Sequence, residues 1–299
     1  MKKQYRPMII LFLAPVTLLY LTLFIYPAGR AFYISLFDWS GFGAGMRYIG
    51  LNNYVEMMSD RTIWEVAMPN TLMIIFAGGV LVFGISFLLS GVLTTKMRGK
   101  KILRAVLFFP SVLSPVAVAV LWGFIYNRQW GLLNSILGAV GLGFLERTWS
   151  APETLFWALL VAYVWMTTGL YCVILVAGLD RVPTTLLEAA EIEGAGELRK
   201  FFSIKLPLIR DIVTTAVILW CISAVKEFAL FFAWGGGIDV PPEGAQNLAV
   251  RMYITAFGKR TLIYRMGYAT TIGVLMFVLI GVIVLCVYMA NRRRDTIEY

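Results

Sequence analysis

The stretch MGYATTIGVLMFVLIGVIVLCVYMA, residues 266–290, contains no Asp, Glu, Lys or Arg. It exceeds the roughly 20 apolar residues that an α-helix needs to cross about 30 Å of hydrocarbon. It is too long for an ordinary strand, and a helix satisfies its own backbone hydrogen bonds in lipid. The stretch therefore predicts a transmembrane helix.

Five further stretches are also long and apolar, four of them without any Asp, Glu, Lys or Arg, and composition agrees with them. The chain is 60% hydrophobic and 14% charged, with a mean hydropathy of +0.78. A soluble domain is nearer half apolar and about a quarter charged. We therefore expect an all-α membrane protein, a six-helix transmembrane bundle forming one domain over residues 1–299. The other five predicted spans are 8–29, 70–94, 105–126, 154–179 and 212–234.

Basic residues set the expected orientation. Lys and Arg are about three times denser in the short segments that would be inside than in those that would be outside, which places both termini in the cytoplasm. A signal peptide is the alternative for the N-terminal MKKQYR and its apolar run. The basic residues behind the net charge of +9 lie mainly in the segments that set the orientation of the spans. They therefore do not indicate nucleic-acid binding. The inside segments are 1–7, 95–104, 180–211 and 291–299.

Several classes of chemistry are disfavoured by what the sequence lacks. There is no histidine, the commonest general base and transition-metal ligand. Cys172, Cys221 and Cys286 lie in apolar runs without metal-binding or redox spacing. No G-x-x-x-x-G-K-[ST] motif is present, so the chain is not expected to bind ATP phosphates. We expect no catalytic residue, no metal site and no cofactor in this chain.

A polar loop, residues 180–211, separates the fourth and fifth predicted spans. It contains EAAEIEGAGELRKFFSIKLP, residues 188–207. Thr185 and Glu188 have the spacing of a capping box that begins a helix, and Gly194 permits a turn before a second helical stretch. Two short helices joined at a glycine elbow are thus predicted outside the bilayer. Their residues alone leave two interpretations open, a solvated connector or a docking element for a soluble partner.

The same loop resembles a known family motif. Glu188-Ala189-Ala190, then Gly194, then Ile204-x-Leu206-Pro207 is similar to the EAA motif of the membrane subunits of binding-protein-dependent ABC importers. Glu193 departs from it, since an aspartate is more usual there. YIGLNNY (48–54) and WGLLNSILGAVGL (130–142) also resemble tracts of the sugar-importer branch, as do the glycines at 235–237. The resemblance runs nearly end to end, and is to maltose- and glycerol-phosphate-type permeases.

The resemblance implies function and partners. In this family the EAA helix docks on an ATPase and transmits its closure, so Glu188, Ala189, Ala190 and Gly194 would form the coupling site. The chain would be a permease subunit for a sugar, oligosaccharide or polyol in a bacterial or archaeal cytoplasmic (inner) membrane. It would pair with a second, different permease and with two ATPase subunits that bind ATP and magnesium. An extracytoplasmic binding protein would deliver the substrate.

Lys226 and Glu227 are the charged residues within the fifth predicted span. Ionisable residues at membrane depth mark substrate pathways by default, although a bracing salt bridge or snorkelling by Lys226 would also explain them. Lys226, Glu227 and Phe228 resemble the family's polar position followed by an aromatic. Aromatic rings and hydroxyl groups suit sugars, and structural packing is the alternative for each of them. These further pathway candidates are Tyr163, Trp165, Tyr171, Tyr268 and Thr271.

Two other functions are compatible with a membrane bundle. A secondary transporter would use an ion gradient through Lys226 and Glu227, but it would not need the docking loop. An integral membrane enzyme would have few groups for its chemistry, because histidine and clustered carboxylates are missing from the predicted spans. The permease reading accounts for the loop and for the spans together.

Overall fold

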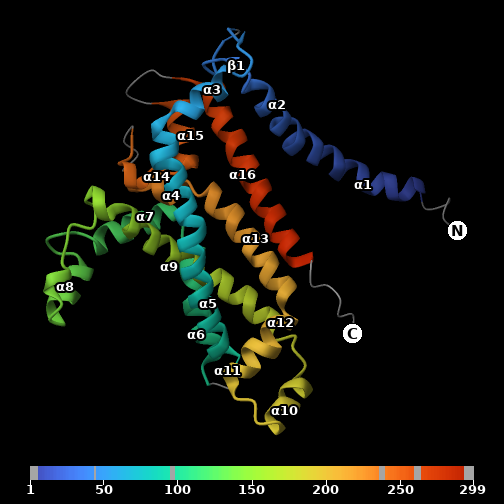
Figure 1. Cartoon of the computed structure of the whole chain (residues 1–299), viewed down its shortest axis with the longest axis vertical. Coiled ribbons are helices and arrows are strands. Elements are labelled where there is room, and N and C mark those ends of the chain that lie inside the picture. The colour runs from blue at the N-terminus through green and yellow to red at the C-terminus, as the bar shows by residue number, and fades with distance from the viewer. Residues whose placement is uncertain (1–5, 44, 95–97, 236–239, 259–263, 293–299) are drawn as a thin grey trace. The chain divides into compact units, whose positions relative to one another are not determined.

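The computed structural model describes residues 6–43, 45–94, 98–235, 240–258 and 264–292 (Figure 1). These residues are mostly helical and divide into two compact units. Unit 1 is Met1–Arg61 with Arg251–Phe277, and unit 2 is Thr62–Val250 with Val278–Tyr299. A single domain over residues 1–299 stays a prediction.

Unit 1 contains one long helical stretch, a small hairpin and the outer parts of two further helices. The hairpin is antiparallel, with Phe37 opposite Tyr48 and Asp38 opposite Arg47. The elements are α1 (Arg6–Tyr20), a π-helical turn (Leu21–Ile25), α2 (Tyr26–Ile34), β1 (Phe37–Asp38), β2 (Arg47–Tyr48), α3 (Asn52–Ser59), most of α15 (Leu248–Phe257) and the start of α16 (Met266–Arg292).

Unit 1 is held together by polar contacts around the hairpin. The Asn53 amide donates to the carbonyl oxygens of Ser35, at 2.8 Å, and Phe37, at 3.0 Å. The Gly267 N–H donates to the Trp39 carbonyl at 3.0 Å. A Cβ at Gly267 would overlap the Phe37 carbonyl oxygen, so the first turn of α16 needs glycine to pack against β1.

Unit 2 is built from helices. Its first span is continuous from Thr62 to Leu93 and includes two π-helical turns, Thr62–Ala67 and Ile74–Gly78. The other elements are α4 (Met68–Met73), α5 (Gly79–Leu93), α6 (Lys100–Phe108), a 3₁₀ turn (Phe109–Val112), α7 (Pro115–Ile125), α8 (Leu132–Ala139), a 3₁₀ turn (Gly143–Leu145), α9 (Pro152–Leu179), α10 (Thr184–Ile192), α11 (Glu197–Lys200), a π-helical turn (Phe201–Lys205), α12 (Leu206–Leu208), α13 (Arg210–Lys226), α14 (Ala229–Trp234) and a 3₁₀ turn (Glu243–Ala245).

The core of unit 2 surrounds α9. In this helix 17 of the 28 residues are buried. Ser86 of α5 donates to the Thr168 carbonyl at 3.1 Å, and the Trp220 indole N–H of α13 donates to the Ile75 carbonyl at 2.8 Å. The fully buried Trp220 also packs closely against Gly79. These contacts join α5, α9 and α13 into one packed group.

Five of the six predicted spans are confirmed as apolar helices long enough to cross a membrane. The ends differ most in the second, which begins at Thr62 rather than at residue 70, because the helix continues through Glu65 beyond the apolar run. The five helices found among the described residues are Leu11–Ile34, Thr62–Leu93, Pro152–Leu179, Arg210–Trp234 and Met266–Asn291.

The third predicted span, 105–126, is not one continuous helix. The segment consists of Lys100–Val112 and Pro115–Ile125, which meet at an angle of 101°. Ser114 has the extended conformation that a following proline favours, and Pro115 begins the new helix. Ser111 fixes the bend, because its hydroxyl donates to the Met166 carbonyl at 2.9 Å.

Candidate functional site

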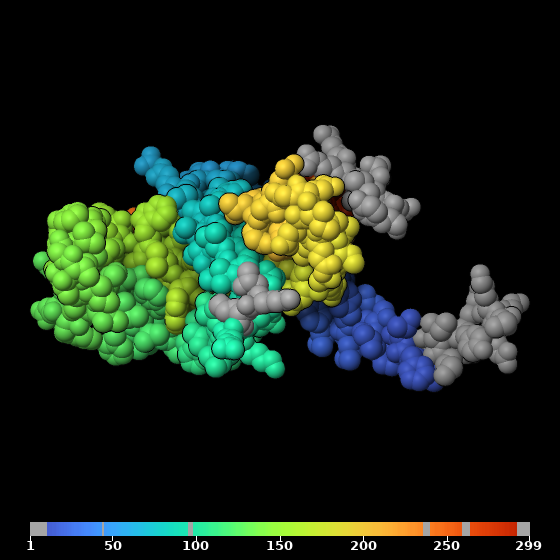
Figure 2. Space-filling model, turned by 90° about the horizontal axis from the view of Figure 1, so that it is seen from below, coloured from blue at the N-terminus to red at the C-terminus, as the bar shows by residue number. Residues whose placement is uncertain are grey.

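The loop between α9 and α13 contains the predicted pair of short helices. The predicted capping box is absent: α10 begins at Thr184, so Thr185 lies inside the first turn, and Pro183 occupies the N-cap position without a side-chain hydrogen bond. The second stretch, predicted over 197–204, is α11 followed by the π-helical turn that ends at Lys205. Figure 2 looks onto this end of unit 2, where the loop, drawn in yellow, is in open view.

Gly194 ends α10 in a left-handed conformation, with φ of 80°. The Gly194 N–H donates to the Glu191 carbonyl at 3.0 Å, and the Ala195 N–H donates to the Ala190 carbonyl at 2.9 Å. These two bonds define a Schellman motif, which satisfies the last carbonyls of the helix. The sequence predicted a turn at this glycine. The structure adds a conformational reason, since L-residues disfavour this region.

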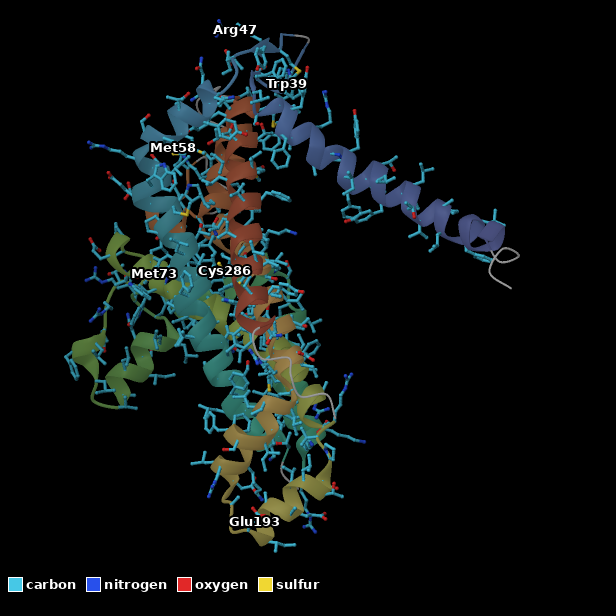
Figure 3. All side chains as sticks on the ribbon, turned by 45° about the vertical axis from the view of Figure 1, so that its right-hand side comes forward. Trp39, Arg47, Met58, Met73, Glu193 and Cys286 are labelled. Atoms are coloured by element: carbon cyan, nitrogen blue, oxygen red, sulfur yellow. The ribbon has the colours of Figure 1, made fainter. Side chains whose placement is uncertain are left out.

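Helix α10 contacts the body of unit 2 through one face. Leu187 packs against a buried apolar cluster formed by Leu175, Leu179, Val182 and Ile209. None of the nine residues of α10, all of them described, is buried. The motif residues Glu188 and Ala189 are exposed, Ala190 is partly exposed, and Ile192 is 89% exposed. Figure 3 shows Glu193 at the tip of this loop.

An ion group that the sequence analysis missed spans the turn between α10 and α11. The Lys200 ammonium pairs with Glu191 of α10, at 3.3 Å, and with Glu197 of α11. Lys205 pairs with the other oxygen of Glu197 at 3.6 Å. Hydrogen bonding between them raises the pKa of Lys200 and lowers the pKa of Glu197. The i, i+3 spacing of Glu197 and Lys200 was readable in the sequence, but the Glu191 contact depends on the turn.

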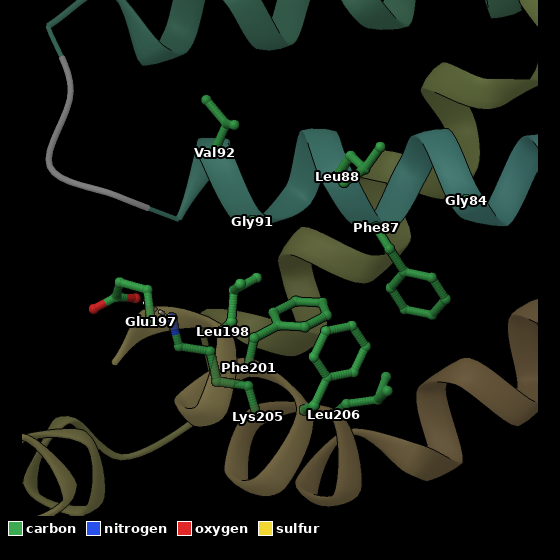
Figure 4. Close-up of a pocket in the computed structure, with 11 residues that line it drawn as sticks. Gly84, Phe87, Leu88, Gly91, Val92, Glu197, Leu198, Phe201, Lys205 and Leu206 are labelled. Carbon is green, nitrogen blue, oxygen red and sulfur yellow. Dashed lines mark ion pairs between the residues drawn. The ribbon is translucent and has the colours of Figure 1, made fainter. Parts of the chain in front are cut away.

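A groove of about 660 Å³ lies between α5 and the segment from α11 to α12 (Figure 4). Its walls are almost entirely apolar, and Glu197 and Lys205 supply its charges. Gly84 and Gly91 leave the α5 wall open, because a Cβ at Gly84 or Gly91 would meet no described atom within 4 Å. The ion group therefore borders an apolar groove of unit 2.

Lys226, Glu227 and Phe228 lie at a break in the fifth span. α13 ends at Lys226, Glu227 is extended, and α14 begins at Ala229. A Glu227 carboxylate oxygen accepts the Leu230 N–H at 3.0 Å, and the Asn247 amide donates to the Glu227 carbonyl at 2.6 Å. The sequence analysis treated these positions as helix interior. The break leaves Lys226 exposed and Glu227 partly exposed within a span, and interrupted helices often form binding sites in transporters.

Tyr163 joins this break to the core. Its ring centroid lies 5.5 Å from Trp220 of α13 and 6.4 Å from Phe231 of α14, so it contacts both half-helices. Tyr171 also packs against Trp220, at 5.7 Å. Both tyrosines are 2% exposed, so each serves as packing within this chain.

The other pathway candidates lie elsewhere. The Trp165 ring packs edge-on against Trp122, with 5.7 Å between the ring centroids. Trp165 also lines a second groove, of about 480 Å³, beside the bend between α6 and α7. In unit 1, the Tyr268 hydroxyl donates to Asp60 at 2.8 Å, and the Thr271 hydroxyl donates to the carbonyls of Gly267, at 3.1 Å, and Ser35, at 3.3 Å. Of the predicted pathway residues, the structure brings Tyr163 together with the break.

The part of the chain that the structure describes offers little for metal or nucleophilic chemistry. No group of three His, Cys, Asp or Glu side chains is found there that could hold a metal ion. Cys172 and Cys221 are buried thiols, and Cys286 is exposed. The arrangement provides two features at opposite ends of α13: the exposed helix α10 precedes it in the loop, and the break at Glu227 follows it.

Comparison with known proteins identifies the family. The family described as "binding-protein-dependent transport system inner membrane component" matches residues 88–295, more than half of the chain. The trehalose/maltose transport system permease protein MalF of Thermococcus litoralis is 32% identical over 273 residues, covering 90% of this chain and 88% of that protein. The diacetylchitobiose uptake system permease protein NgcF of Streptomyces coelicolor is 31% identical over 278 residues, covering 89% and 77% respectively.

A solved structure has the same fold. One chain of a bacterial alginate ABC transporter, in complex with its alginate pentasaccharide-bound periplasmic protein, superposes with a TM-score of 0.78 at 19% identity. The match covers 100% of this chain and 99% of that chain. With its apolar helices, this chain is a multi-pass membrane protein, and it belongs to the binding-protein-dependent transport system inner membrane components, the permease subunits of ABC transporters.

Proposed function

We propose that this chain is one permease subunit of an ABC importer for a sugar, oligosaccharide or polyol. The sugar class is supported by the relatives, one named for trehalose and maltose and another for diacetylchitobiose. ATP and magnesium would bind on two associated ATPase subunits, and a second, different permease would complete the membrane part. An extracytoplasmic binding protein would deliver the cargo, and both termini would be cytoplasmic in the inner membrane.

The observation that supports this proposal most is the exposure of α10. The motif residues Glu188 and Ala189 point away from the body of unit 2, and Ile192 is almost fully exposed. A nine-residue helix with no buried residue gains little stability from its own chain. A partner that encloses this outer face would explain why the loop is long, helical and partly apolar.

The mechanism follows from the connections of α10. Its inner face contacts the end of α9 through Leu187 and the apolar cluster, and the chain continues through α11 and α12 into α13. When the ATPase subunits close around α10, the helix would move and displace the ends of both spans. α13 leads to the break at Glu227, so movement at the loop would reach the proposed substrate pathway.

The contacts described above divide the predicted pathway residues into those at the break in the fifth span and those that lie elsewhere. Lys226, Glu227 and Phe228 would face substrate at the break, with Tyr163 positioning the two half-helices. Glu188, Ala189, Ala190 and Gly194 would form the ATPase-coupling site. Trp165, Tyr171, Tyr268 and Thr271 remain predicted pathway residues whose known contacts are structural.

Crosslinking and uptake test the proposal together. Ala189→Cys on the exposed face should form a crosslink to the ATPase subunit in the purified importer, and a buried control, Ala162→Cys of α9, should not. Proteoliposomes loaded with ATP should take up at least one sugar from a panel of maltose, trehalose and diacetylchitobiose. Uptake by the chain alone, driven by an ion gradient, would instead favour the secondary transporter.

A further inference from the structure

The turn between α10 and α11 is built from residues that allow movement. Gly194, Ala195 and Gly196 join the two helices, and we call these three residues the elbow. A Cβ at Gly194 or Gly196 would meet no described atom within 4 Å, so nothing described packs closely around the glycines. Glycine has the greatest backbone freedom. Force applied to α10 would therefore bend the elbow unless another contact joins the two helices.

Such a contact is the ion group defined by Glu191, Glu197, Lys200 and Lys205. Lys200 links a carboxylate on α10 to a carboxylate on α11, on opposite sides of the elbow. Its side chain is only 7% exposed, whereas those of Glu191 and Glu197 are 73% and 68% exposed. Because neighbouring residues cover its side chain, the ammonium stays close to both carboxylates. Lys200 is thus the ordered centre of the group.

Two contacts on one face of α10 complete the arrangement. Leu187 and Glu191 are one helical turn apart, so their side chains lie on the same side of the helix. Leu187 contacts the apolar cluster, which joins the end of α9 to Ile209 just before α13, and Glu191 contacts Lys200 beyond the elbow. The helix is held at two points along its inner face, while its outer face stays exposed.

We propose that Lys200 is a positioning residue that fixes the angle between α10 and α11, so that displacement of α10 is transmitted to α13 rather than absorbed at the elbow. This inference rests on the proposed function, because the force would come from the ATPase. Lys200 occupies none of the positions that define the EAA motif, and it would act through α10. Loss of Lys200 would stop the transmission of movement from α10 to α13, while the helices on either side of the elbow would remain.

The first test measures the angle directly. Spin labels on Glu193→Cys and Asp211→Cys, both exposed positions, report the separation of the α10 tip from the start of α13 in the assembled importer. The exposed Cys286 is replaced by serine, and Cys172 and Cys221 are buried. Lys200→Met should turn a narrow distance distribution into a broad one. Arg199→Met removes the same charge from an exposed neighbour outside the ion group, and it should leave the distribution narrow.

The second test measures transmission. In proteoliposomes, Lys200→Met should lower the number of panel sugar molecules taken up per ATP hydrolysed by about fivefold or more, the lower end of typical coupling effects. ATP hydrolysis itself should persist. Glu191→Gln should act in the same direction, and Lys200→Arg should restore most of the coupling. Because Glu191 is exposed, its variant remains informative if Lys200→Met fails to assemble.

The outcomes separate this inference from the proposed function. If wild-type importer shows no ATP-dependent uptake, the proposed function fails. If wild-type importer transports with ATP, but Lys200→Met and Glu191→Gln match it in distance distribution and in sugar per ATP, the positioning role is refuted. If Arg199→Met is as damaging as Lys200→Met, the loss reflects general charge and the specific contact is likewise refuted.

Discussion

Helices α9 and α10 follow each other in the chain, yet their surroundings are opposite. α9 has 28 residues and is the most buried long helix among the described residues, while α10 has nine residues and none of them is buried. Their contacts explain the difference: α9 is packed by α5, α6 and α13, and α10 reaches the same body through one face. A helix that keeps most of its surface exposed in its own chain is where an external partner is expected. The comparison therefore predicts that substitutions in α9 should change stability and those in α10 should change transport.

The sharpest test of the α9 side is Gly169→Ala. A Cβ at Gly169 would overlap the Leu107 carbonyl oxygen, so the bent third span would have to move away. Overpacking of this kind costs about 1–3 kcal/mol. We expect a lower melting temperature of the purified importer and reduced membrane expression. Gly84→Ala is the matched control, because a Cβ there would meet no described atom within 4 Å, and alanine favours helix by up to about 1 kcal/mol. Equal stability of the two variants would contradict the packing around α9.

Gly194→Leu tests the α10 side and should abolish uptake while membrane insertion persists. Leucine at φ of 80° costs about 1–2 kcal/mol and disturbs the turn that ends α10. Gly196 has φ of −69°, which any residue adopts, so Gly196→Leu separates strain from bulk. We expect sugar uptake in proteoliposomes to be lost for the first variant and largely kept for the second. Normal uptake by Gly194→Leu would contradict the expectation that changes at α10 affect transport, because the end of α10 would then be altered without any effect on uptake.

The sequence predicted what local composition determines and missed what tertiary contacts determine. Apolar run length located five spans, and Gly194 marked the end of α10. The sequence did not predict the breaks in the third and fifth spans, for two different reasons. Pro115 is compatible with a kink within a helix and with the start of a new helix. Glu227 is compatible with a helix interior, and the contact of its carbonyl with the Asn247 amide depends on the tertiary structure. Thr185 had the spacing of a cap, but α10 begins at Thr184, two residues before the first helical residue that this cap predicts. Lys200 carried no signal beyond its i, i+3 spacing from Glu197, because Glu191 reaches it across the elbow.

A smaller effect on transport is expected from substitutions of Glu227, which lies neither in the buried helix α9 nor in the exposed helix α10. Its carboxylate caps α14 through the Leu230 N–H, and it lies at the break in the proposed pathway. Glu227→Gln keeps an acceptor oxygen but removes the charge, whereas Glu227→Ala removes both and should cost about 1 kcal/mol, the usual loss of a helix cap. We expect Glu227→Gln to change substrate-stimulated ATP hydrolysis severalfold at unchanged melting temperature. If Glu227→Gln matches wild type on every panel sugar and Glu227→Ala only destabilises, the residue is scaffolding.

The smallest expected effect is that of pH on the ion group at the elbow. The Lys200 hydrogen bond lowers the pKa of Glu197 below its ordinary 4.5, so the contribution of Glu197 is present above that value and is lost as pH falls through the lowered pKa. The Glu197 hydrogen bond raises the pKa of Lys200 above its ordinary 10.5, so its contribution is lost only as pH rises through the raised pKa. The spin-label distribution between positions 193 and 211 should therefore stay unchanged from about pH 6 to about pH 9. A broadening within that range would show that a different group, titrating near neutrality, holds α10 in place, because Glu197 and Lys200 keep their charges there.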